Sequence, residues 1–126
     1  MKKVFLLIGG VMFVTLMVLF LYITNGLSEG KNVVLNGIDL TNISDGMYVG
    51  TYDFKRWTNT VHVHVKDNEI ISIVIVEDET GSDITDCSGE ILRRVLDAQN
   101  TQVDAVTGAT VTSKAYLKAI ENALNN

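Results

Sequence analysis

The sequence contains no proline and a single cysteine, Cys87. Turns therefore depend on glycine, asparagine and aspartate. One cysteine excludes an intrachain disulfide, and Cys87 lies too far from the N-terminal apolar run to carry the lipid of a lipoprotein. Free cysteine is among the most buried residue types, so we expect Cys87 in the core. A reactive thiol is the alternative, because the sequence predicts a helix start nearby.

Positive charge and histidine are also scarce. Residues 26–126 carry eight Lys and Arg against fifteen Asp and Glu, a net charge of −7. Nucleic acid and anionic lipid surfaces attract basic proteins, so this composition argues against both, and we expect no nucleic acid partner. The two histidines, His62 and His64, fall on one face of a predicted strand. Without a third histidine or a cysteine nearby, they do not predict a metal site.

A long apolar run opens the chain. Val4–Thr24 is 21 residues without a charged side chain, and Lys2 and Lys3 precede it. A bilayer core of about 30 Å needs about 20 apolar residues in a helix, so the run is long enough to span a membrane. A secretory signal has a shorter apolar region, about 7–15 residues, and a small-residue cleavage site. We therefore expect an uncleaved anchor, with a removed signal as the alternative. The positive-inside rule predicts a cytoplasmic N-terminus and an extracytoplasmic C-terminal domain at the cell membrane.

Composition divides the chain into three parts: a transmembrane anchor at residues 1–24, a linker at 25–44 and one domain at 45–126. In the linker, Asn36-Gly37 lies between two short apolar runs and is typical of a type I′ hairpin turn. We expect the second half of the linker to pack on the domain. The domain itself is large enough for one small core.

Hydrophobic periodicity within the domain predicts strands first and helices afterwards. Period-two patterns indicate strands at Tyr48–Tyr52, Thr60–Lys66 and Ile70–Glu77, with a short one at Thr101–Val103. The third strand has apolar residues on both faces, which favours a central strand covered on both sides. Helical periodicity follows at Thr85–Ala98 and Ser113–Leu124. This order predicts an α+β fold, in which an N-terminal transmembrane helix precedes a small antiparallel sheet with two packed helices.

The polar segment before the second helix is the candidate site. Gly108 allows a positive φ angle and close approach to the backbone. The N–H groups at a helix start are unpaired, and the positive end of the helix dipole favours an anion such as phosphate. Thr110 would place a hydroxyl beside these donors. The alternative is an ordinary cap, in which Thr112 or Ser113 satisfies the helix start.

Four segments of the chain resemble one family. The run Asp104-x-x-Thr107-Gly108-Ala109-Thr110-x-Thr112-Ser113 is similar to the flavinylation motif of the FMN-binding domain family. That family includes the covalent-FMN subunits of the sodium-pumping NADH:quinone oxidoreductase and of the Rnf complex. The other three segments are Asp45-Gly46-x-Tyr48-x-Gly50, the hairpin Val61–Ile75, and Glu79-Thr80-Gly81. The resemblance covers about Asp45 to Leu124, and Thr107 stands where the family usually has serine.

The resemblance implies a covalent cofactor. A separate flavin transferase, using FAD and a divalent metal, would join the FMN phosphate to the Thr110 hydroxyl. The positions implied around this FMN are Asp104, Thr107, Gly108, Ala109, Thr112 and Ser113, with Glu79 and Thr80 lining the flavin. For Glu79 and Thr80 the alternative is a solvated acidic loop. Trp57 and Tyr52 either stack on the flavin ring or pack in the core.

The function that follows is electron transfer. We expect a membrane-anchored extracytoplasmic flavoprotein that carries electrons between a membrane donor and an acceptor, without catalytic turnover of its own. Its partners would be the transferase and redox proteins of the cytoplasmic membrane. One alternative is a non-redox module, an anchored assembly or sensory subunit of a membrane complex. The other is a reductase of a small substrate, for which the sequence shows no acid–base constellation.

Overall fold

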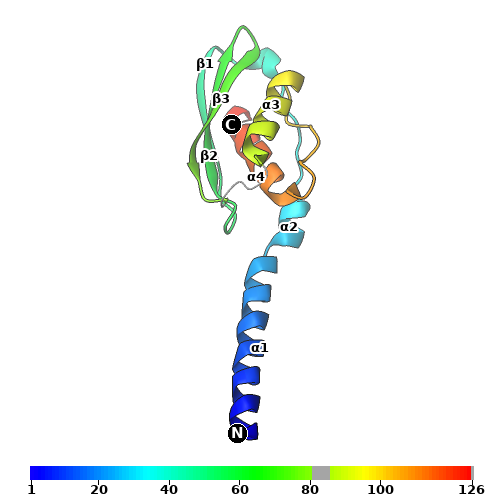
Figure 1. The fold of residues 1–126 in the computed structure, drawn as a ribbon. Helices are drawn as coiled ribbons and strands as arrows, with labels where there is room; N and C mark the ends of the chain where they lie inside the picture. The colour runs from blue at the N-terminus through cyan, green and yellow to red at the C-terminus, as the bar shows by residue number, and fades with distance from the viewer. Residues whose placement is uncertain (81–85, 126) are drawn as a thin grey trace.

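The structure is a computed structural model of the 126-residue chain, and it describes residues 1–80 and 86–125. The helices and strands are α1 (Lys2–Thr24), α2 (Leu27–Lys31), the 3-10 helix η1 (Leu40–Asn42), β1 (Gly46–Tyr52), β2 (Asn59–Lys66), β3 (Glu69–Asp78), α3 (Cys87–Ala98) and α4 (Thr110–Leu124). This arrangement confirms the predicted α+β class (Figure 1). Gly81 and Thr85, which belong to predicted segments, lie outside the described residues.

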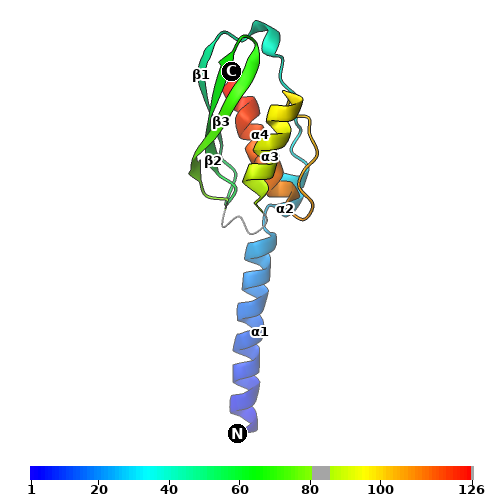
Figure 2. The same ribbon diagram turned by 45° about the horizontal axis from the view of Figure 1, so that its top comes forward.

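Helix α1 projects from the domain as a single rod (Figures 1 and 2). Its 23 residues span about 35 Å at 1.5 Å per residue, and none of them is buried. Within the described residues one helix is long and apolar enough to cross a membrane, and it is this one with its continuation through α2. Gly26, with φ +87°, separates α1 from α2. The anchor therefore ends close to the domain.

The sheet is antiparallel in the order β1-β2-β3, and α3 and α4 cover one of its faces (Figure 2). The inward residues of the central strand, Val61, Val63 and Val65, are all buried against these helices. Gly50 lets α4 approach β1 closely, because a Cβ there would lie 2.0 Å from the Ala119 carbonyl oxygen. The core thus lies between one sheet face and two helices, and it includes Cys87, which is buried as expected.

The prediction that Ile70–Glu77 is a central strand is wrong, since β3 lies at the edge of the sheet. Two irregularities in its pairing with β2 leave Ile71 and Val76 without a directly opposed residue. Each extra residue resets the alternation, so Ile70 and Ile73 both face the core although they are three residues apart. Ile71, Val74 and Val76 remain exposed on the outside. Apolar residues at both odd and even positions of β3 therefore result from the two bulges, and not from burial of both faces of the strand.

The linker forms no hairpin, which corrects the interpretation of Asn36-Gly37. Gly37 does adopt a positive φ of +80°, but its neighbours bond to α4 instead of to each other. Asn36 N–H donates to Glu121 Oε1 at 3.0 Å, and Asn125 Nδ2 donates to the Gly37 carbonyl at 3.0 Å. Leu35, Ile38, Leu40 and Ile43 pack on the core. The second half of the linker is therefore packed on the domain, as expected.

The short strand predicted at Thr101–Val103 is also wrong, because that segment forms no strand. Thr101 is fully buried, and its hydroxyl donates to Glu121 Oε2 at 3.2 Å. Hydrogen bonds from Asn100, Thr101 and Gln102 tie the segment to the linker and to α4, and its backbone pairs with none of the three described strands. Thr101 is therefore buried because it contacts α4 and bonds to Glu121, and not because it belongs to a strand.

Candidate functional site

Helix α4 begins at Thr110, three residues before the predicted start at Ser113. Ala109 occupies the N-cap position and makes no side-chain cap hydrogen bond. The first bond of the helical ladder runs from Ser113 N–H to the Ala109 carbonyl, at 2.8 Å. The N–H groups of Thr110, Val111 and Thr112 precede that bond and have no partner within the helix. The ordinary-cap interpretation is therefore wrong, and the helix start presents free donors.

The turn before the helix leaves these donors open. Gly108 has φ +82°, a conformation that L side chains rarely adopt, and no atom lies within 4 Å of a Cβ placed there. Glycine is needed at this position for its backbone and not for space. Thr107 and Gly108 are exposed, whereas Ala109 and Thr110 are half-buried. The motif thus forms a solvent-facing turn that leads directly into the uncapped helix.

A cavity of about 340 Å³ lies at this helix start. Its lining comes from three parts of the chain: Gly108, Ala109, Thr110, Val111 and Thr112 at the start of α4, Arg56 and Trp57 after β1, and Leu27 and Lys31 of α2. Two of these side chains are cationic, and no Asp or Glu is among the described residues that line it. Free amides, a helix N-terminus and two cations together favour an anion.

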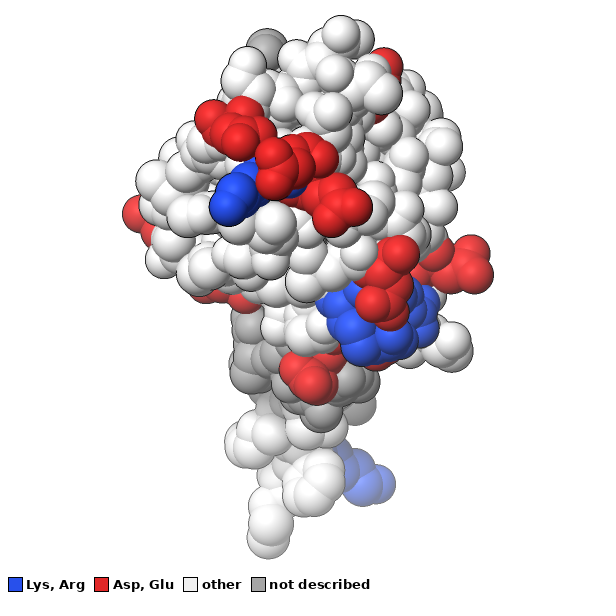
Figure 3. Space-filling view, turned by 90° about the horizontal axis from the view of Figure 1, so that it is seen from above, with Lys and Arg blue, Asp and Glu red and all other residues white. Residues whose placement is uncertain are grey.

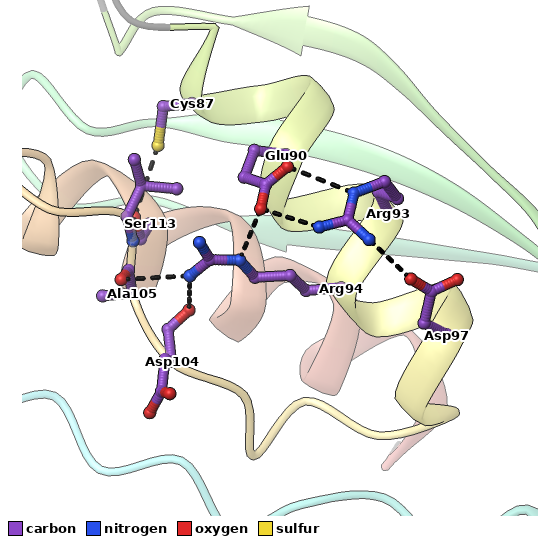
Figure 4. A network of polar contacts seen from close by, with 9 residues as sticks. Cys87, Glu90, Arg93, Arg94, Asp97, Asp104, Ala105 and Ser113 are labelled. Carbon is purple, nitrogen blue, oxygen red and sulfur yellow. Dashed lines mark hydrogen bonds and ion pairs between the residues drawn. The ribbon is translucent and has the colours of Figure 1, made fainter.

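Ser113 lies behind the motif and not in the cavity. Its buried hydroxyl donates to the Ala109 carbonyl at 2.6 Å and accepts from Val106 N–H at 3.0 Å. Cys87 Sγ lies 3.3 Å from the same oxygen, which links the motif to α3 (Figure 4). Ser113 was predicted among the residues around the cofactor, and in the structure its hydrogen bonds hold the backbone of the turn.

Arg94 of α3 holds the other end of the motif. Its Nη1 donates to the Asp104 carbonyl at 2.7 Å and to the Ala105 carbonyl at 3.2 Å, while its Nε donates to Glu90 at 2.8 Å (Figure 4). Hydrogen bonds from Arg93 and Arg94 lower the pKa of Glu90 to about 2, so this carboxylate is ionised near neutral pH. The Asp104 carboxylate is exposed, points away from the guanidinium, and does not line the cavity beside Thr110 (Figure 4).

Replacing Arg94 by glutamine should loosen the motif. Two charge-assisted bonds to carbonyls are lost, so we expect unfolding in urea to become easier by about 1 kcal/mol. Amide hydrogen exchange between residues 104 and 109 should also accelerate. Arg93→Gln is the matched control. Within the described part of the chain Arg93 bonds only to Glu90 and Asp97, on its own exposed helix face, and such pairs contribute little. Equal effects of the two substitutions would contradict a positioning role for Arg94.

The same network gives a pH dependence. Because the pKa of Glu90 is lowered on folding, its contribution is fully present above the ordinary value of 4.5. It is lost as the pH falls from 4.5 towards about 2, where the folded-state carboxylate takes up its proton. The protection of the 104–109 amides, measured as their exchange rate relative to that of the unfolded chain at the same pH, should fall in that window and stay constant above it.

Glu79 and Thr80 do not meet Thr110. The Thr80 hydroxyl bonds to Asp78 and to the Tyr116 hydroxyl, the latter at 2.8 Å. Glu79 lines a second hollow of about 400 Å³ together with Tyr22, Asn25, Lys55 and Arg56. Arg56 lines both hollows, so Glu79 lies in the space next to the Thr110 cavity.

The structure favours packing for Trp57. Only 2% of its surface is exposed, and it packs with Val111 and Ala115 of α4. The Arg56 guanidinium lies 4.5 Å from its ring centroid, and the Phe54 ring stacks at 6.2 Å. The Trp57 ring thus packs in the core and supports the Arg56 guanidinium, and it is not free to stack on a flavin. Tyr52 belongs to the same aromatic group, and partial burial raises its pKa.

Sequence reasoning missed the two cations. Lys31 and Arg56 lie 79 and 54 residues before Thr110, and neither stands in a recognisable motif. Packing of α2 against α4 positions Lys31, and packing of Trp57 against α4 positions Arg56. No local sequence pattern encodes such contacts. Among the described residues no group of three His, Cys, Asp or Glu is arranged to hold a metal ion.

Comparison with known families gives one match. The model of the FMN-binding domain matches residues 57–125, more than half of the chain. The matched residues include Trp57 and the whole Gly108–Thr112 lining of the cavity, but not Leu27, Lys31 or Arg56. No curated protein matches the chain.

Proposed function

The chain belongs to the FMN-binding domain family, and from that premise we propose that it carries FMN covalently, through the hydroxyl of Thr110. Flavin binding follows from membership of the family. One observation supports Thr110 as the attachment point: it opens an uncapped helix and lines a cavity with two cations. These groups suit the phosphate of FMN, because free amides and cations donate to its oxygens and none of the described lining residues is a carboxylate.

Attachment would be a phosphoryl transfer from FAD. A bond forms between Thr110 Oγ1 and the FMN phosphorus, the pyrophosphate bond to AMP breaks, AMP leaves, and the hydroxyl proton passes to a base. A threonine hydroxyl is a weak nucleophile without a base or a metal. The described cavity lining holds no His, Asp or Glu to act as that base. We therefore assign base and divalent metal to a separate flavin transferase.

Bound FMN supplies one- and two-electron redox chemistry, and the residues of the chain bind and orient it. The cavity wall at Leu27 begins three residues after Thr24, the last residue of α1. A cofactor there would lie next to the membrane surface. This supports electron exchange with redox proteins or carriers of the cytoplasmic membrane, with the N-terminus inside and the domain outside.

The test is co-expression of the full chain with an active flavin transferase. The intact mass should rise by one FMN less one water, and the purified protein should be yellow with flavin fluorescence in a denaturing gel. Expression without the transferase is the control and should leave the mass unchanged. A colourless protein of unmodified mass, from cells where the transferase modifies another acceptor, would reject the proposal and favour a non-redox anchored module.

A further inference from the structure

We propose that the juxtamembrane helix α2 and the adjoining Arg56 form part of the flavin site, with Lys31 and Arg56 binding the FMN phosphate beside the free amides of α4. The proposal rests on the proposed function for the identity of its ligand. It does not require that the ligand be covalently attached. Both cations lie outside residues 57–125, which match the family.

Helix α2 packs closely against the start of α4. Gly30 is buried, and a Cβ there would lie 2.4 Å from Val111 Cγ1, so only glycine allows α2 to lie this close to α4. Lys114 Nζ donates to the carbonyls of Lys31 and Val33. These contacts fix the backbone that carries Lys31 against the first turn of α4.

Arg56 is held in place by two contacts. Its guanidinium stacks on the buried Trp57 and donates to the Ile23 carbonyl at 3.0 Å. One side of the group is thus covered and one donor is used, while four of its five N–H bonds stay available. Arg56 joins the last turn of α1 to the cavity beside Thr110.

Lys31 and Arg56 have no ion-pair partner among the described residues. The other cations near this site are engaged: Lys55 pairs with Glu29 at 3.1 Å, and Lys114 bonds to backbone carbonyls. The domain is acidic as a whole, and acidic side chains predominate on the end that faces away from α1 (Figure 3). Two unpaired cations in one cavity of such a domain indicate an anionic ligand.

Phosphate fits these groups best. Guanidinium and ammonium donate charge-assisted hydrogen bonds to its oxygens, and the helix start adds amides and dipole. A phospholipid headgroup offers the same phosphate chemistry, and it is close at hand beside an anchor. The two sources differ in the flavin ring, so they can be separated by experiment.

The experiment uses the full chain, expressed without a flavin transferase and purified in detergent. It is titrated with FMN and with riboflavin, which lacks the phosphate, and binding is followed by flavin fluorescence. FMN should bind at least about tenfold more tightly than riboflavin. Lys31→Gln and Arg56→Gln should each weaken FMN binding by about tenfold and leave riboflavin binding unchanged. Lys31→Arg should restore the affinity.

Lys66→Gln is the matched control, because Lys66 is an exposed lysine on β2 outside the cavity lining. It should bind FMN like the wild type. Gly30→Val keeps both charges but forces α2 away from Val111, and it should weaken FMN binding as well. Lys31 is exposed, so Lys31→Gln should leave the melting temperature unchanged, whereas Arg56→Gln loses the contacts with Trp57 and Ile23 and should lower it slightly.

Three results would overturn the proposal: equal affinity for FMN and riboflavin, equal losses in Lys31→Gln and Lys66→Gln, or displacement of FMN by equimolar anionic phospholipid. The last would assign the cations to a headgroup. Failure of covalent attachment with intact FMN binding would refute only the Thr110 assignment. Successful attachment with unaltered binding in both cation variants would refute only the role of Lys31 and Arg56.

Discussion

Replacing Thr110 by valine should abolish covalent flavin attachment in a protein that still folds. Valine keeps the β-branched shape and lacks only the oxygen that would bond to phosphorus. The Thr110 side chain makes no cap hydrogen bond, so little stability should be lost with the hydroxyl, within about 0.5 kcal/mol. Intact mass after co-expression with the transferase should equal that of the unmodified chain, and no flavin fluorescence should remain in a denaturing gel.

Thr112→Val supplies a strict comparison for this result. Thr112 lies two residues along the same first turn and lines the same cavity, so any general effect of losing a threonine there would appear in both variants. We expect Thr112→Val to accept FMN and Thr110→Ser to keep the modification through its own hydroxyl. Persistence of the flavin in Thr110→Val, or its loss in Thr112→Val alone, would move the attachment point.

The start of α4 shows why part of the site could not be predicted from local sequence. Thr112 and Ser113 are residues that commonly cap helices, so they predict a start at Ser113. The helix instead begins three residues earlier behind Ala109, which has no cap to offer. A helix end that breaks the capping rule is where free donors remain, and functional sites are where such rules fail. The family motif predicted Thr110 as the attachment point, whereas the capping preferences of Thr112 and Ser113 favoured an ordinary helix cap.

The fold was more predictable where periodicity is unbroken. Val61, Val63 and Val65 alternate with polar residues, and β2 is the central strand with these three in the core. In β3 the two bulges mix the parities, so the pattern predicts the wrong place in the sheet. The position of Lys31 in the cavity depends on α2 packing against α4, a contact over roughly 80 residues of chain. A pattern read over a short stretch of sequence cannot include both α2 and α4.

The burial of Glu121 does not follow from the helical pattern, since a carboxylate on a helix is expected at the surface. Here it is 1% exposed. Its oxygens accept from Asn36 N–H at 3.0 Å, from the Thr101 hydroxyl at 3.2 Å and from Lys118 Nζ at 3.4 Å. One buried carboxylate on α4 therefore bonds both to the linker and to the segment that follows α3.

Glu121→Ala should consequently be strongly destabilising, by about 3 kcal/mol, because it leaves buried donors without acceptors and opens a small cavity. For a domain of this size that corresponds to a fall in melting temperature of roughly 15 °C. Glu121→Gln keeps one acceptor oxygen and should lose about half as much. Circular dichroism melting of the full chain in detergent measures both. Glu69→Ala, an exposed carboxylate on β3, is the control and should melt like the wild type.

The position of Glu121 also makes this variant a test of how the anchor is joined to the domain. The linker that it fastens at Asn36 runs from α2, whose Lys31 lies only five residues earlier. If the tether positions α2, Glu121→Ala should weaken FMN binding at temperatures well below its own melting transition. Gly50→Ala, which strains the contact between β1 and α4 by placing a Cβ 2.0 Å from the Ala119 carbonyl, should lower the melting temperature without this effect. Equal FMN affinity in the two variants would show that the domain core alone, without the linker, holds α2 in place.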